Sequence, residues 1–175
     1  MNTPPTGGLG KGMMLGAWVL LLLLLTLVFG RVLERRENPN PDPGGVVTGE
    51  AREVRLVRNA DGHYVAGGAV NGLPVTFLVD TGATRVAVSK RLADRLGLER
   101  RGGTFSRTAN GVVAVWQTRL DRVRLGVIEQ RAVPAVILPE LEPWDQVLLG
   151  MSFLKHLEME QRDGVLVLRQ KPRGK

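Results

Sequence analysis

The chain has 175 residues, of which 43% are hydrophobic, with 22 glycines and 10 prolines, a composition that favours short strands and turns over long helices. It has no cysteine, which excludes a disulfide framework, a thiol nucleophile and cysteine-bound zinc. The net charge is +7, but the arginines are scattered singly through expected strands with little aromatic interleaving, so we expect no nucleic-acid partner and favour solvated strand faces or attraction to anionic lipid.

The first element is an apolar segment at 13–30, MMLGAWVLLLLLLTLVFG, which carries no charge. As a helix, Met13 to Phe29 would span about 25 Å at ~1.5 Å per residue, the short end of what a bilayer core requires. The segment is longer than the usual core of a signal peptide, and no small-residue cleavage pattern closes it. A buried core helix is the alternative, but this helix would be apolar on every side. We predict one uncleaved transmembrane helix, preceded by a tail at 1–12.

The charged residues on either side of the span support two opposite orientations of the chain in the membrane. Lys11 precedes the span, whereas Arg31, Arg35 and Arg36 come after it, and this excess would place the C-terminal domain in the cytoplasm. A short tail with one lysine before a leucine-rich core is instead the usual form of a signal anchor, which exports the domain on its C-terminal side. We favour a single-pass inner (cell) membrane protein with its domain on the extracytoplasmic side.

Residues 31–45 are expected to be a linker, because ENPNPDPGG at 37–45 holds three prolines and two glycines in nine residues and has no means of building a core. The folded domain is predicted over 46–170, with a tail at 171–175. Apolar and charged side chains alternate through this domain, as in half-buried strands. Strands are predicted at 53–59, 61–72, 73–80, 84–89, 130–138, 145–150 and 164–170, a long hairpin at 103–126, and short helices at 89–98 and 151–158.

This pattern of short strands with one or two small helices predicts an all-β domain, closed or sandwiched. Its most apolar strand, LPVTFLVD at 73–80, ends on Asp80 and is succeeded at once by Thr81 and Gly82. A plain turn is the first explanation, since Asp and Gly are favoured turn residues. However, the carboxylate ends an apolar strand, the turn brings backbone N–H donors close, and a second strand ends at 148–150 in Leu-Leu-Gly before a helix.

The chain from about 51 to 169 resembles a single-domain retropepsin-like (clan AA) aspartic protease of the membrane-anchored bacterial type. The matching stretches are LVDTGAT at 78–84, TANG at 108–111 and LLGMSFL at 148–154. The resemblance implies the single lobe of an acid protease, a closed or partly open β-barrel, and an aspartic endopeptidase activity on polypeptides. It implies no cofactor and no metal.

The resemblance also assigns roles to individual residues. It makes Asp80 catalytic, with support from the rest of its loop, and it implies that a second motif packs behind that loop and that a hairpin at 105–113, with its tip at Asn110-Gly111, covers the substrate. The loop residues are Thr81, Gly82 and Ala83, the packing residues are Leu148, Leu149 and Gly150, and the substrate-binding residues of the hairpin are Thr108, Ala109, Asn110 and Gly111.

Peptide hydrolysis by this route needs two carboxylates that share one proton, because two like charges so close cannot both ionise readily. The chain offers one Asp-Thr-Gly in a domain half the size of a two-lobed enzyme. We therefore predict a C2 homodimer in which Asp80 of each copy meets its counterpart. The alternative is a non-catalytic binding or regulatory module on the same fold, with Asp80 only a turn residue.

Other candidate motifs are weaker. Ser152 and Lys155 match the Ser-x-x-Lys of penicillin-recognising enzymes, but the companion motifs are absent. His63 and His156 lack metal-ligand spacing. Asp145 lies close to Leu148, and it is expected to end the loop before that strand rather than to act as a second catalytic acid.

Overall fold

The computed structural model describes residues 7–108, 111–139 and 141–171, and the chain forms two compact units, Met1–Arg36 and Glu37–Lys175. Helix α1 runs from Gly7 to Glu37, and its segment Gly12–Glu37 is long and apolar enough to cross a membrane. The helix continues past Gly30, where we expected the span to end, because all of RVLERRE at 31–37 except Val32 are good helix formers. It ends before Asn38-Pro39, since a residue that precedes proline is disfavoured in the α region.

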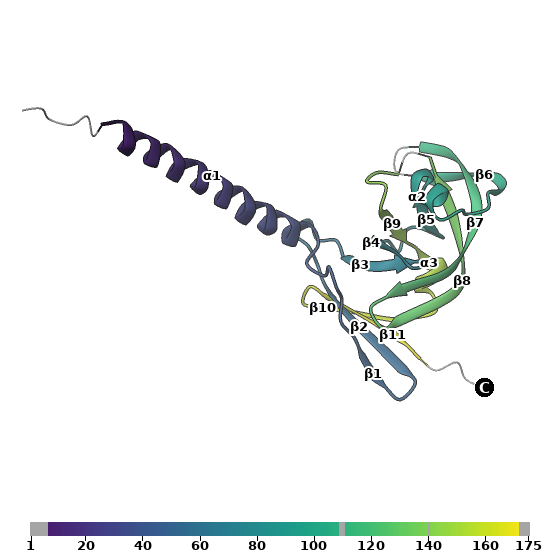
Figure 1. Ribbon diagram of the computed structural model, residues 1–175. Helices are drawn as coiled ribbons and strands as arrows, with labels where there is room; N and C mark the ends of the chain where they lie inside the picture. The colour runs from purple at the N-terminus through teal and green to yellow at the C-terminus, as the bar shows by residue number, and fades with distance from the viewer. Residues whose placement is uncertain (1–6, 109–110, 140, 172–175) are drawn as a thin grey trace, which may run out of the picture. The chain divides into compact units, whose positions relative to one another are not determined.

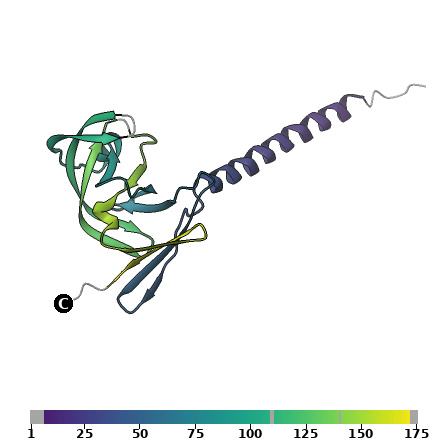
Figure 2. The same ribbon diagram turned by 180° about the vertical axis from the view of Figure 1, so that it is seen from behind.

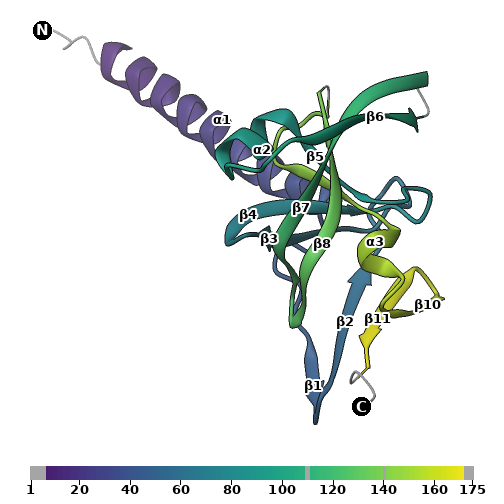
Figure 3. The same ribbon diagram turned by 90° about the vertical axis from the view of Figure 1, so that its right-hand side faces the viewer.

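The predicted barrel is confirmed in the second unit. Seven strands form a sheet in the order β3-β4-β9-β5-β8-β7-β6, and a further antiparallel pairing of β3 with β7 closes all of them except β6 into a ring. β6 pairs with β7 outside the ring, as Figure 3 shows. The strands are β3 (Val65–Val70), β4 (Leu73–Val79), β5 (Val86–Ser89), β6 (Arg101–Thr108), β7 (Gly111–Leu125), β8 (Ile128–Leu138) and β9 (Gln146–Leu149).

A smaller four-stranded sheet has the order β1-β2-β11-β10 and lies at the end of the domain away from β6 (Figures 1 and 2). Its inner face buries Val54, Leu56, Leu166 and Leu168, which join the barrel side chains in one hydrophobic core. The alternation of β2 and β11 predicted this burial. The strands are β1 (Val46–Thr48), β2 (Ala51–Val57), β10 (Glu158–Arg162) and β11 (Val165–Gln170).

Two short helices complete the unit. Helix α2 (Lys90–Arg95) begins after Ser89, whose hydroxyl accepts a hydrogen bond from the Leu92 N–H at 3.0 Å, as the sequence predicted. Helix α3 spans only Met151–Leu154, half the predicted length, because the chain turns into strand β10. Every residue of β10 is exposed, so no apolar alternation was available to predict it.

The segment expected to be a tether lies against the domain. Asn40 is 8% exposed; its Nδ2 donates to the carbonyls of Val57 (2.8 Å) and Val65 (2.7 Å), and its Oδ1 accepts from the Val57 N–H (2.8 Å). A Cβ at Gly67 would lie 1.9 Å from the Pro41 carbonyl oxygen, so only glycine permits this close approach. The compact unit therefore begins at Glu37, upstream of the predicted Val46.

The first prediction concerns this asparagine. Asn40→Ala is expected to lower the free energy of unfolding by about 3 kcal/mol, because it leaves one buried and two partly buried backbone groups without their partner, and a buried group left unpaired costs ~1–3 kcal/mol. Denaturant unfolding of the full chain in uncharged detergent measures the change. The control is Asp42→Ala in the same segment, where the side chain is exposed. If the two variants were equally stable, the hydrogen bonds of Asn40 would not hold this segment against the domain.

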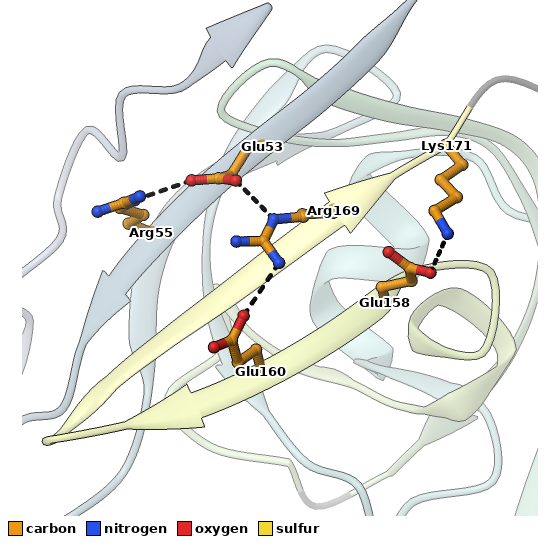
Figure 4. A network of polar contacts seen from close by, with 6 residues as sticks. All are labelled: Glu53, Arg55, Glu158, Glu160, Arg169 and Lys171. Carbon is orange, nitrogen blue, oxygen red and sulfur yellow. Dashed lines mark hydrogen bonds and ion pairs between the residues drawn. The ribbon is translucent and has the colours of Figure 1, made fainter.

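The outer face of the smaller sheet carries a chain of ion pairs (Figure 4). Arg169 donates to Glu53 at 2.6 Å and to Glu160 at 3.0 Å, and Glu53 also pairs with Arg55 at 2.8 Å. The hydrogen bond from Arg169, and after it that from Arg55, lowers the pKa of Glu53 below its usual range. These contacts join β2, β11 and β10 across their exposed face.

The second prediction rests on the sign of this shift. Because the folded state lowers the pKa of Glu53, the stabilisation is complete above the unfolded pKa of about 4.3 and is lost as the pH falls through the lower folded value. We expect the unfolding midpoint to fall more steeply between about pH 5 and pH 3 in wild type than in Glu53→Gln. Glu50→Gln, in the exposed turn before β2, is the control and should keep the wild-type slope.

Candidate active site

The carboxylate of Asp80 is placed by the strands on both sides of β4. The Val79 N–H donates to the Tyr64 carbonyl at 2.9 Å, and the Asp80 N–H donates to the Leu149 carbonyl at 3.2 Å. β4 and β9 run parallel, with Val79 opposite Leu149. Asp80 therefore stands at the carboxyl end of a central strand, which fixes its backbone before the turn begins.

The loop after β4 holds one carboxylate oxygen and leaves the side chain accessible. The Gly82 N–H donates to Asp80 Oδ1 at 2.9 Å, and the Ala83 N–H donates to the Asp80 carbonyl at 3.3 Å. A Cβ at Gly82 would lie 3.2 Å from the same Oδ1, so glycine lets the backbone approach the carboxylate. Asp80 is partly exposed, and Thr81 and Gly82 are exposed. Among the described residues, the Thr81 hydroxyl makes no hydrogen bond to Asp80.

The Leu148-Leu149-Gly150 stretch lies directly behind this loop. β9 sits between β4 and β5, and Leu148 is opposite both Leu78 and Ala87. The Met151 N–H, just after Gly150, donates to the Ala83 carbonyl at 2.8 Å. Gly150 packs so closely that an added Cβ would lie 2.4 Å from the Arg85 carbonyl oxygen and 2.6 Å from that of Ala83.

Ser152 has a structural role that the sequence did not reveal. Its hydroxyl donates to the Pro134 carbonyl at 2.7 Å and accepts from the Val86 N–H at 2.9 Å, and the residue is 7% exposed. The hydroxyl thus joins α3 to β8 and to the start of β5, beside the Asp80 loop. Both of its hydrogen bonds are to backbone and none is to Lys155, so the geometry gives no support to a Ser-x-x-Lys nucleophile.

The predicted covering hairpin is formed by β6 and β7. Thr108 pairs with Gly111. Ala109 and Asn110 lie outside the described part of the chain, so the predicted tip at Asn110-Gly111 stays a prediction. Phe105 and Val112 are 77% and 65% exposed. Phe105 is paired with Ala114, and Val112 with Arg107, so these apolar side chains lie on one face of the hairpin.

The arrangement supplies one carboxylate. Within the described residues no second acid is hydrogen-bonded to Asp80, and no group of three or more His, Asp or Glu side chains could hold a metal ion. A barrel that carries an aspartate at the end of a central strand, a glycine loop that holds it and a hydrophobic-hydrophobic-glycine strand behind that loop defines one lobe of an aspartic protease.

Comparisons with known proteins agree with this class. The family described as "gag-polyprotein putative aspartyl protease" matches residues 66–156. An uncharacterized protein of the cobV 5′ region of Sinorhizobium sp. is 30% identical over 165 residues, 87% of this chain and 70% of that protein. An uncharacterized protein of Rickettsia prowazekii is 33% identical over 112 residues, 62% of this chain and 47% of that one.

Among solved structures, a retropepsin-like aspartic protease from Rickettsia conorii matches with a TM-score of 0.59 and 30% identity, and covers 69% of this chain and 92% of its own. This chain belongs to the retropepsin-like aspartic protease family. The predicted resemblance is thereby confirmed, and the family match over 66–156 includes the Asp80 loop, strand β9 and Gly150.

Proposed function

We propose that the chain is an aspartic endopeptidase, anchored in the inner membrane by α1 with its domain on the extracytoplasmic side, whose catalytic groups are Asp80 of two copies. The proposal rests on the position of the Asp80 carboxylate. It is partly exposed at the end of a central strand, and the Gly82 N–H holds one of its oxygens at 2.9 Å. This fixes the direction of the carboxylate and leaves its other oxygen available for water or a second carboxyl group.

The chemistry requires two such groups that share one proton. The ionised Asp80 takes a proton from a water molecule as the water oxygen attacks the peptide carbonyl carbon. The protonated Asp80 gives its proton to the carbonyl oxygen, so the intermediate is a neutral gem-diol. In the collapse of the intermediate, the first carboxyl gives its proton to the nitrogen as the C–N bond breaks, and one hydroxyl of the gem-diol returns a proton to the second carboxylate. The products are an amine and a carboxylic acid, and the pair again holds one proton.

The dimer supplies the second carboxylate. Thr81, Gly82 and Thr84 are exposed around Asp80, which leaves this surface free to meet an identical surface across a two-fold axis. Anchoring both copies in one membrane would raise their effective concentration. We assign the β6–β7 hairpin, with Thr108, Ala109, Asn110 and Gly111, to covering the bound polypeptide, since its exposed Phe105 and Val112 offer an apolar face to substrate side chains.

The test is cleavage of a mixed peptide library by the purified full chain, with wild type compared to Asp80→Asn. Crosslinking in membranes measures the oligomeric state in parallel. A non-catalytic module on the same fold would leave the library intact, remain monomeric and retain its biological role in the Asp80→Ala variant. Cleavage by a preparation that is monomeric throughout would contradict the shared pair of carboxylates.

A further inference from the structure

A shallow hollow lies beside α2, on a surface that the proposed chemistry does not use. It is lined by Lys90, Arg91, Asp94, Arg95 and Pro139 and has a volume of about 560 Å³, which falls in the size range of ligand sites. Four of these residues lie in α2, and Pro139 directly follows β8.

Two guanidinium groups are fixed at this hollow by one indole. The guanidinium carbon of Arg91 lies 5.3 Å from the centroid of the Trp144 ring, and that of Arg95 lies 4.3 Å from it. Trp144 is itself held, since its carbonyl accepts from the Ser89 hydroxyl at 2.6 Å and its side chain packs against the core. A guanidinium stacked on a ring keeps its N–H donors at the edge, where they can bind an oxyanion.

The charge of these two arginines is not neutralised within the described residues. Asp94 is occupied, because it pairs with Lys90 at 2.9 Å and with Arg100. These cations, with the Lys90 hydrogen bond first, hold the pKa of Asp94 below its usual range. Arg101 next to them is paired with Glu99. Arg91 and Arg95 have no ion pair in the described part of the chain, so the unpaired positive charge of this surface is concentrated at Trp144.

We propose that the Arg91–Arg95 pair on Trp144 binds a carboxylate side chain of an acidic segment in the polypeptide substrate, outside the cleavage site. This inference rests on the proposed function. Trp144 lies in the turn before β9 (Gln146–Leu149), and at the far end of this strand the Leu149 carbonyl accepts from the Asp80 N–H. The length of β9, roughly 10 Å at a rise of ~3.3 Å per residue, therefore separates this turn from the proposed catalytic residue. An extended peptide of about five residues is long enough to cross that strand.

The local arrangement favours a peptide carboxylate over a lipid surface. The guanidinium groups of Arg91 and Arg95 lie over one ring beside a hollow, an arrangement that suits a single carboxylate side chain. A bidentate hydrogen bond between guanidinium and carboxylate is both strong and directional. Attraction to a membrane requires basic side chains spread over a plane, whereas the neighbouring Lys90, Arg100 and Arg101 are paired with Asp94 and Glu99.

The experiment measures binding without cleavage. The full chain carrying Asp80→Asn, in uncharged detergent, is titrated with a short labelled peptide containing three consecutive glutamates, and with the same peptide containing glutamines. We expect the glutamate peptide to bind roughly tenfold more tightly. Arg91→Gln/Arg95→Gln should abolish this preference, and Arg91→Lys/Arg95→Lys should retain only part of it, because lysine keeps the charge but loses the bidentate geometry.

The matched control is Arg122→Gln/Arg124→Gln, which removes the same charge from exposed positions of β7, near the β7–β8 turn and away from α2 (Figures 1 and 3). It should keep the tenfold preference. Equal binding of the two peptides, or an equal loss in the control, would overturn the proposal. The proposal would also be overturned if the chain bound micelles doped with an anionic phospholipid through Arg91 and Arg95 but bound the glutamate and glutamine peptides equally. Failure of wild type to cleave any peptide would refute the proposed activity but would leave this binding result unchanged.

Discussion

Asp80→Asn is expected to lower the rate of peptide cleavage by at least about 10³-fold, because each carboxyl of the pair must both accept and donate a proton and an amide can do neither. The substitution keeps the shape of the side chain, and the amide oxygen can still accept the Gly82 N–H bond that Oδ1 accepts at 2.9 Å. The unfolding midpoint should therefore stay close to that of wild type. Initial rates on a substrate from the peptide library, together with denaturant unfolding, measure both quantities.

The same variant tests whether the catalytic pair is shared between copies. If the copies exchange freely, adding an equal amount of Asp80→Asn chains should reduce the wild-type activity to about half, and a fourfold excess should reduce it to about a fifth, because mixed dimers hold only one carboxylate. The control is an equal amount of the Asp80→Asn chain treated with a crosslinker beforehand, which cannot exchange. Activity that stays constant under both additions would show that each copy works alone.

Local patterns in the sequence predicted the strands of the barrel, and the short motifs that carry the family resemblance predicted the role of the Asp80 loop. Alternation of period two marks strands whatever their partners are, and Asp80, Gly82 and Gly150 stand in short motifs next to those strands. Closure of the barrel could not be predicted in this way. It depends on Ala69 and Val70 pairing with Arg124 and Val123, residues more than fifty positions away in the chain.

Contacts made by single polar residues were also beyond the sequence. Asn40 stands in a proline-rich stretch typical of a linker, and nothing near it shows that its amide will meet the backbone of Val57 and Val65. The stacking of Arg91 and Arg95 on Trp144 joins α2 to a loop about fifty residues later. The Trp144 side chain packs against the core, and the two arginines lie over its ring.

Gly150→Ala is expected to lower the free energy of unfolding as much as Asn40→Ala does. The added Cβ would lie 2.4 Å from the Arg85 carbonyl oxygen and 2.6 Å from that of Ala83. Both are backbone atoms, and the Ala83 carbonyl is also held by the Met151 N–H at 2.8 Å, so neither can move without breaking the loop. Gly150 has a φ of −88°, a value that alanine adopts without strain, so the cost is steric. We expect about 3 kcal/mol, the upper range for overpacking.

Activity should fall further than stability alone explains, because the strained loop carries Asp80 and a misplacement of about 1 Å can cost 10²-fold in rate. Rates measured at a temperature where the variant is still folded separate the two effects. Gly103→Ala is the control, since a Cβ there meets nothing within 4 Å, and it should leave stability unchanged. If Gly150→Ala matched that control in both stability and rate, the close packing of β9 against the Asp80 loop would not hold in solution, and the placement of the catalytic carboxylate would need another cause.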